Sequence, residues 1–214
     1  MDMIAALVLA AGGSRRMGRT KMLLPAAGGT LLASALAPLL EAPLGRVVVV
    51  LGHEAEAVRH GSALPADARL RIVVNEAWSE GLASSIRRGL EECGDAEAVL
   101  VALGDQVGRT AADVHRIVEA WRPGVPLVVP VHGGRAGHPV AFARELWDEL
   151  RGQGGDVGGR EVVKRHWHRA VLVECGPAAD LDTPEDYEAW RQARRSASGE
   201  GLPRPDGEKP PERR

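Results

Sequence analysis

The sequence predicts an α/β fold, a three-layer α/β/α sandwich in which a mostly parallel sheet lies between two layers of helices. Two features support this prediction. Short apolar runs rich in β-branched residues recur along the chain, as in strands that are covered on both faces. Segments with apolar residues three and four positions apart lie between several of these runs, as in helices that pack on a sheet. Strands that alternate with helices form βαβ units, which build a parallel sheet.

The predicted elements follow one another in a regular order. The runs that predict strands are residues 4–10, 47–51, 71–74, 98–103, 126–131 and 170–174. The apolar stripes that predict helices are residues 31–40, 82–90 and 114–121. Pro38 should kink or end the first helix, and Thr110 is suited to cap the third. In such folds, ligands bind beyond the carboxyl ends of the strands.

Composition bounds the domain organisation and the partners. We expect one domain over residues 1–195 and a disordered tail over residues 196–214, which is rich in Gly, Pro and charge. Because 27 Lys and Arg nearly balance 29 Asp and Glu, no nucleic-acid partner is expected. The apolar residues 3–11 lack a basic leader and are fewer than the roughly 20 that span a bilayer. We therefore expect a cytoplasmic protein without a membrane partner, with Cys93 and Cys175 as buried thiols.

The segment LAAGGSRRMGRTKMLLP, residues 9–25, directly follows the first predicted strand. A glycine-rich turn at a strand end leaves backbone N–H groups free to bind an anion such as phosphate. The dinucleotide fingerprint GxGxxG is absent, and the P-loop GxxxxGK[ST] fails because Arg19 stands where lysine belongs. Charge alone leaves two interpretations open, a phosphate cradle of another kind or a solvated basic turn.

This segment resembles the signature of the MobA-like nucleotidyltransferases, LAAGxSxRMGxxKxLLP. The fixed positions that match are Leu9, Ala10, Ala11, Gly12, Ser14, Arg16, Met17, Gly18, Lys21, Leu23, Leu24 and Pro25. The resemblance implies a Rossmann-like sheet of the nucleotide-diphospho-sugar transferase type. It also implies that the loop binds a nucleoside triphosphate through Leu9, Ala10, Ala11, Gly12, Gly13, Ser14 and Gly18. Arg16 and Lys21 would contact the phosphates, whereas Arg15 and Arg19 fall on variable positions and are expected as surface charge.

Four later segments continue the resemblance, which extends from residue 4 to about residue 190. They are NEAWSEGLASSIRRGL (75–90), VHGGRAGHPVAF (131–142), GGDVGGR (154–160) and DLDTPEDY (180–187). The first implies that Gly81, Ser84 and Ser85 lie near the nucleotide base. The second places His138 near the acceptor, although a structural histidine is the alternative. These details fit best the branch of the family that makes the cytidine dinucleotide form of the molybdenum cofactor.

Two carboxylates are candidates for binding Mg²⁺, which nucleotidyl transfer requires to neutralise phosphate charge. Asp105 follows a predicted strand, and Asp182 precedes a helix that Thr183 and Pro184 would start. A turn aspartate and a helix-cap acid are the alternatives. The resemblance implies that both bind the metal, while Asp180 is either a third acid or scaffold. Residues 104–107 read GDQV where the family has ADQP, and Leu82 replaces a usual methionine.

The resemblance implies transfer of CMP from CTP to the terminal phosphate of molybdopterin, with release of pyrophosphate. Arg16, Lys21 and Asp105 would carry the catalysis, because a phosphate monoester is already an anion and needs no general base. The acceptor pocket is expected from residues 130–165, and a molybdoenzyme or its chaperone is a candidate partner. Two alternatives stay open: an NAD(P)H-dependent oxidoreductase of the nicotine-blue-reductase type, and a non-catalytic delivery protein that binds a nucleotide or cofactor.

Overall fold

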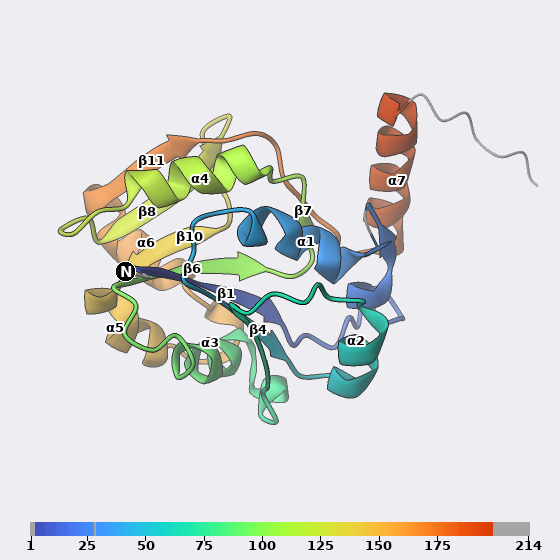
Figure 1. The fold of residues 1–214 in the computed structure, drawn as a ribbon, viewed down its shortest axis with the longest axis horizontal. Coiled ribbons are helices and arrows are strands. Elements are labelled where there is room, and N and C mark those ends of the chain that lie inside the picture. The colour runs from blue at the N-terminus through green and yellow to red at the C-terminus, as the bar shows by residue number, and fades with distance from the viewer. Residues whose placement is uncertain (1–2, 28, 199–214) are drawn as a thin grey trace, which may run out of the picture.

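The computed structural model describes residues 3–27 and 29–198 and has an eight-stranded central sheet (Figure 1). Its strands are β1 (Ile4–Ala10), β4 (Arg46–Leu51), β5 (Leu70–Val74), β6 (Ala98–Leu103), β8 (Leu127–His132), β9 (Arg135–Ala136), β10 (Val140–Ala143) and β11 (Ala170–Glu174). The order is β11-β8-β10-β6-β1-β4-β5, and β9 pairs with β8. Strand β10 runs antiparallel to both β6 and β8, while β5, β4, β1 and β6 are parallel. The mostly parallel sheet is therefore confirmed.

Helices cover both faces of this sheet, which confirms the three-layer sandwich (Figure 1). The α-helices are α1 (Leu31–Leu40), α2 (Ala55–Gly61), α3 (Leu82–Leu90), α4 (Ala111–Ala120), α5 (Trp147–Arg151), α6 (Arg160–His166) and α7 (Pro184–Ser198). Apolar residues of α1, α2 and α4 pack on one face, against alternate residues of β1 such as Ala6 and Val8. Those of α3, α5 and α6 pack on the other face, against Ala5 and Leu7. Strand β1 thus lies at the centre of both cores.

All six predicted strands form, and each is within one residue of its expected bounds. The three predicted helices also form, and Pro38 lies inside α1, which ends two residues later at Leu40. The prediction missed β10, because its four residues were assigned to a turn of the family motif. It also missed two small two-stranded sheets, β2 (Pro25–Ala26) with β3 (Gly29–Thr30), and β7 (Gln106–Val107) with β12 (Ala179–Asp180).

The C-terminal helix extends beyond the predicted domain boundary. Residues 196–198 belong to α7, and the rest of the predicted tail, residues 199–214, lies outside the described residues. Thr183 caps this helix as expected, since its hydroxyl accepts from the Asp186 N–H at 3.2 Å, and Pro184 is the first helical residue. None of the helices in the described part of the chain has the length and apolarity needed to span a membrane.

Helix α4 begins with a buried anchor that also holds the chain after β11. Thr110 caps α4 as expected, and Asp113 closes a capping box with it. Asp113 is 2% exposed, and its second oxygen accepts from the Gly176 N–H at 3.1 Å and from Arg116. Burial tends to raise the pKa of Asp113, but these hydrogen bonds outweigh it, so its pKa lies below the usual range.

We expect Asp113→Asn to lower the free energy of unfolding by about 1–3 kcal/mol at neutral pH, because every contact of this carboxylate is with a donor. The introduced amide NH₂ would face one of those donors. Since the pKa of Asp113 is lowered on folding, its stabilisation is complete well above pH 4 and disappears as the pH falls through the folded-state pKa. Urea unfolding of both proteins at pH 7 and below pH 4 checks this, and a difference that stays constant with pH would contradict it.

Candidate active site

The predicted site residues converge at the carboxyl edge of the sheet. Strand β1 leads into the signature loop, and its neighbour β6 leads to Asp105. Asp182 follows β12, which pairs with β7 directly after Asp105, and the Leu181 N–H donates to the Asp105 carbonyl at 3.3 Å. The short β7–β12 ladder therefore brings together two acids that are 77 positions apart in the sequence.

The signature loop is folded around Ser14. This residue has a left-handed φ of 50°, and its carbonyl accepts from the N–H groups of Met17 and Gly18 at 3.0 and 3.2 Å. Its hydroxyl accepts from the Lys21 N–H at 3.1 Å. Gly18 has a φ of 68°, where a side chain would be strained. These contacts fix the backbone at the base of the Lys21 side chain.

A small apolar core holds the loop in place. It contains Met17, Leu24, Leu31, Val107, Leu181 and Tyr187. The Tyr187 hydroxyl also donates to the Pro25 carbonyl at 2.7 Å. Several apolar residues of the signature therefore have a packing role. Val107, which replaces the family's proline, fills part of this core. Arg15 and Arg19 are exposed, as expected, and Arg19 lies over the Tyr187 ring. Arg15, however, also lines the cavity above the loop, which was expected only of Arg16 and Lys21.

Lys21 lies between the two predicted metal-binding acids. Its Nζ forms an ion pair with Asp105 Oδ2 and a second one, at 3.1 Å, with Asp182 Oδ1. Arg16 Nη2 lies 2.8 Å from the other oxygen of Asp182. The side chains of Lys21 and Asp105 are only 13% and 15% exposed, while that of Asp182 is 34% exposed. The structure thus brings together all four residues predicted for phosphate and metal binding.

The charges in this cluster stabilise one another. Burial lowers the pKa of Lys21, but the contacts with Asp105 and Asp182 outweigh it, so the pKa lies above its usual value. Burial likewise tends to raise the pKa of Asp182, and Lys21 and Arg16 reverse the effect, so that pKa is lowered. Lys21 is therefore cationic and Asp182 anionic at neutral pH.

The donor set suits a hard divalent cation that also binds a ligand. Asp105 and Asp182 present carboxylate oxygens to one point, where the Lys21 ammonium lies. Among residues 3–27 and 29–198, no group of three or more His, Cys, Asp and Glu is arranged to hold a metal ion. Mg²⁺ typically takes one or two carboxylates and completes its shell with water and substrate phosphates. The two acids fit that pattern.

A cavity of about 540 Å³ opens over the loop and the acids. The predicted residues on its wall are Leu9, Ala11, Gly12, Gly13, Ser14, Arg16, Lys21, Gly81, Ser85, Asp105 and Asp182. Trp78 forms another side, and its ring packs against Gly13 and makes an edge contact with His53 at 5.1 Å between centroids. Of the described residues predicted to bind the nucleotide, Ala10, Gly18 and Ser84 do not line this cavity.

Ser84 lies behind the wall in a network that the sequence analysis missed. Asn75, 4% exposed, donates to the hydroxyls of Ser84 and Ser85 at 2.8 and 3.0 Å and accepts from the Ala77 N–H. The Ser84 hydroxyl is also within hydrogen-bond distance of the Gly81 carbonyl, at 2.8 Å. Asn75 could have been predicted as a site residue, because it is a polar residue that directly follows β5 at the carboxyl edge of the sheet, where ligands bind. Ser84 thus supports the turn at Gly81, whose φ is 103°.

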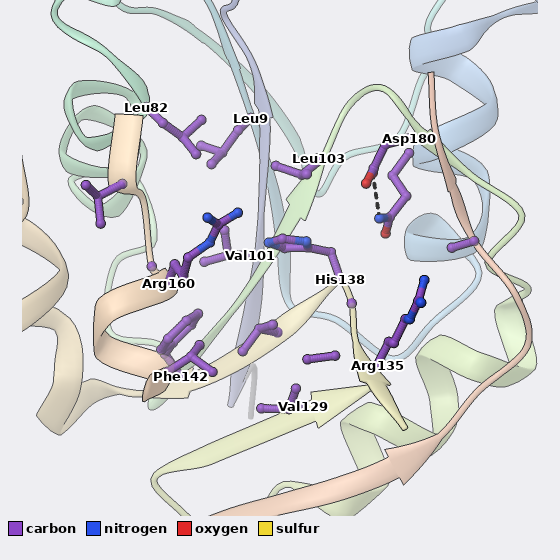
Figure 2. Close-up of a pocket in the computed structure, with 18 of the residues that line it drawn as sticks. Leu9, Leu82, Val101, Leu103, Val129, Arg135, His138, Phe142, Arg160 and Asp180 are labelled. Carbon is purple, nitrogen blue, oxygen red and sulfur yellow. Dashed lines mark hydrogen bonds between the residues drawn. The ribbon is translucent and has the colours of Figure 1, made fainter. Parts of the chain in front are cut away.

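A second cavity of about 970 Å³ adjoins the first and shares Leu9, Leu82, Leu103 and Asp156 with it (Figure 2). Its floor is apolar, formed by residues such as Val101, Val129 and Phe142. Its charged lining residues are Arg109, Arg135, Arg160 and Lys164 against Asp156 and Asp180. Many of these residues lie within the segment 130–165 predicted for the acceptor pocket. The cavity is therefore suited to an anionic ligand with an apolar body.

His138 and Asp180 belong to this second cavity. Figure 2 shows the His138 and Arg160 side chains pointing into it. Burial lowers the pKa of His138, despite the nearby Asp180 and Asp105 carboxylates, so the ring is neutral at neutral pH. Asp180 accepts a hydrogen bond from Gln106 Nε2 at 2.8 Å, drawn as a dashed line in Figure 2. Asp180 therefore engages a neutral partner rather than a cation of the Lys21 cluster.

Arg109 joins the walls of the second cavity. Its Nε donates to the His138 carbonyl at 2.7 Å, and its Nη1 donates to the Gly176 carbonyl. The guanidinium thus ties the segment before β10 to the segment that leads to Asp180 and Asp182. Arg109 could not be predicted as a site residue, because a single arginine after a short strand forms no sequence pattern.

Comparison with known proteins agrees with this geometry. The model of the MobA-like NTP transferase domain matches residues 6–170. The chain is 33% identical over 202 residues to nicotine blue oxidoreductase of Paenarthrobacter nicotinovorans, covering 88% of this chain and 94% of that protein. It is 25% identical over 188 residues to molybdenum cofactor cytidylyltransferase of Escherichia coli K12, covering 87% and 95%.

Solved structures show the same fold. Rv0371c of Mycobacterium tuberculosis H37Rv is 31% identical and superposes with a TM-score of 0.77, covering 89% of this chain and 98% of that one. Its complex with manganese superposes with a TM-score of 0.74 at 29% identity, over 89% and 99%. The signature loop, the cluster of Lys21 with two acids and the match over residues 6–170 agree, and the chain belongs to the MobA-like NTP transferase family.

Proposed function

We propose that this protein transfers CMP from CTP to the terminal phosphate of molybdopterin, releasing pyrophosphate in a Mg²⁺-dependent reaction. The observation that carries the proposal is the convergence of Lys21, Asp105 and Asp182 beside the glycine-rich loop. A protein that only carried a cofactor would need the cradle but not the acid pair. The family membership supports nucleotidyl transfer, and the similarity to the E. coli cytidylyltransferase supports CTP.

The chain's own residues would orient and neutralise the reactants. Arg16 and Lys21 would bind phosphate oxygens of CTP while backbone N–H groups of the loop hold the triphosphate. Asp105 and Asp182 would hold Mg²⁺, which supplies a positive charge for the phosphate oxygens. Because the attacking phosphate is already anionic at pH 7, no side chain has to remove a proton. Catalysis would then depend on in-line positioning and charge neutralisation.

The second cavity supports an anionic acceptor. Four cationic side chains against two carboxylates line it, above an apolar floor that would suit a fused ring system. It adjoins the cavity over the loop, with which it shares Leu9, Leu82, Leu103 and Asp156. An acceptor phosphate could therefore reach the α-phosphorus of a nucleotide bound over the loop.

The second candidate function is reduction of a substrate by a nicotinamide cofactor. The 33% identity to nicotine blue oxidoreductase favours it, and the same cavities could hold a dinucleotide and a flat heterocycle. Two features weigh against it: the sequence lacks GxGxxG, and hydride transfer has no use for Asp105 and Asp182 around one cation.

Calorimetric binding distinguishes the two functions. CTP, GTP, ATP and NADPH would each be titrated, with and without Mg²⁺, into the wild type, Asp105→Asn and Asp148→Asn. The last is the matched control, since the Asp148 side chain is 94% exposed on α5. We expect CTP to bind more tightly than the other three nucleotides and to need Mg²⁺ for binding. Its affinity should be lower for Asp105→Asn than for the wild type, and unchanged for Asp148→Asn. Binding of NADPH that is indifferent to Mg²⁺ and to Asp105 would contradict the proposal.

A further inference from the structure

The Lys21 ammonium lies between Asp105 and Asp182 and contacts one carboxylate oxygen of each. It contacts Asp105 Oδ2 and lies 3.1 Å from Asp182 Oδ1, with its side chain only 13% exposed. Arg16 pairs with the remaining Asp182 oxygen at 2.8 Å. Two cationic side chains thus balance the two carboxylates.

This arrangement opposes binding of a divalent cation to the free protein. A cation shared by Asp105 and Asp182 would have to displace the ammonium or lie close to it, where two positive charges repel strongly outside bulk water. The displaced ammonium would also lose both of its partners. Both carboxylates therefore already have a cationic partner, which a metal ion would have to replace.

A nucleotide removes this obstacle by offering the same cations another partner. Lys21 and Arg16 both line the cavity over the glycine-rich loop, where a polyphosphate would lie. The four-carbon stem of lysine lets its ammonium move while its backbone stays fixed by Ser14. The Arg16 side chain is 69% exposed and is free to turn toward phosphate oxygens as well.

We propose that Lys21 is a built-in counter-ion that keeps divalent cations off Asp105 and Asp182 until a nucleotide polyphosphate draws the ammonium away. This inference rests on the proposed function, because it takes the two acids as the metal ligands. It makes metal and nucleotide binding cooperative: each ligand raises the affinity of the other by the same factor. The protein would then take up metal together with the nucleotide rather than before it.

Mn²⁺ binding followed by electron paramagnetic resonance tests the proposal without turnover. The proteins are the wild type, Lys21→Met, Lys21→Arg and Arg122→Met. The last variant also removes one positive charge and is the matched control, because Arg122 is exposed and follows the end of α4. Without nucleotide, we expect Lys21→Met to bind Mn²⁺ roughly 5- to 150-fold more tightly than the wild type, the usual range of such couplings. Lys21→Arg and Arg122→Met should bind it as weakly as the wild type.

The same titration with a non-hydrolysable CTP analogue completes the test. The analogue should raise the Mn²⁺ affinity of the wild type more than that of Lys21→Met, after subtraction of Mn²⁺ bound by the analogue alone. Equal Mn²⁺ affinities of the two nucleotide-free proteins would overturn the inference while leaving the proposed function intact. A wild type that binds no Mn²⁺ even with the analogue would overturn both.

A measurement on the wild type covers the case in which Lys21→Met does not fold. The chain has three lysines, Lys21, Lys164 and Lys209, so a ¹⁵N-lysine spectrum contains few ammonium signals to assign. Mg²⁺ alone at millimolar concentration should leave the Lys21 signal in place, and Mg²⁺ with the CTP analogue should shift it. A shift caused by Mg²⁺ alone would overturn the inference.

Discussion

Asp105→Asn is expected to lower the rate of pyrophosphate release by about 10²- to 10³-fold, the usual cost of removing one preorganised charge-stabilising group. The substitution keeps the size of the side chain but removes the charge that faces Lys21. An amide is also a far weaker ligand for a hard divalent cation than a carboxylate. The rate would be measured with saturating CTP, molybdopterin and Mg²⁺.

The surface variant Asp148→Asn is the control for this measurement and should keep the wild-type rate. Thermal unfolding of both variants excludes a general loss of structure. If Asp105→Asn turned over within threefold of the wild type, Asp105 would not serve the reaction through its charge, and the assignment of the acid pair would be wrong.

Asp182→Asn and Asp180→Asn form a second, internally matched pair, with a large effect expected only for the first. Asp182 meets two cations, Lys21 and Arg16, at 3.1 and 2.8 Å. Asp180, two residues earlier, accepts one hydrogen bond from the neutral Gln106 amide. We expect about a 10²-fold loss of turnover for Asp182→Asn and less than about tenfold for Asp180→Asn.

Dependence on Mg²⁺ concentration separates the roles of these two acids. If Asp182 holds the metal, Asp182→Asn should need a higher Mg²⁺ concentration for half-maximal rate, while Asp180→Asn should not. Equal losses with unchanged Mg²⁺ dependence would show that both acids act through the fold of the 176–184 segment.

Much of the fold was predictable because its buried strands are continuous apolar runs. The centre of the sheet, β1 and β4, consists almost entirely of buried aliphatic residues, so both its existence and its parallel pairing followed from the pattern. Strand β10 was missed because it has four residues and directly follows His138 and Pro139, which have the character of a turn. Its pairing with β6 and β8 is long-range, and no local signal reports it.

The candidate site was predictable where strand ends meet and not where contacts are tertiary. Asp105 and Lys21 follow neighbouring strands, so their approach followed from topology. Ser84 was expected at the base pocket, yet it lies behind the wall, because Asn75 from another strand end engages its hydroxyl. At position 104, where the family has alanine, an added Cβ would lie 3.0 Å from the Ala10 Cβ, so glycine relieves a tight contact.

The decisive measurement is pyrophosphate release from CTP in the presence of molybdopterin and Mg²⁺. We expect release that requires CTP, the acceptor and the divalent ion, with formation of the cytidine dinucleotide product and loss of activity in Asp105→Asn. No pyrophosphate under these conditions, together with metal-independent reduction of a heterocyclic substrate by NADPH that survives Asp105→Asn, would contradict it.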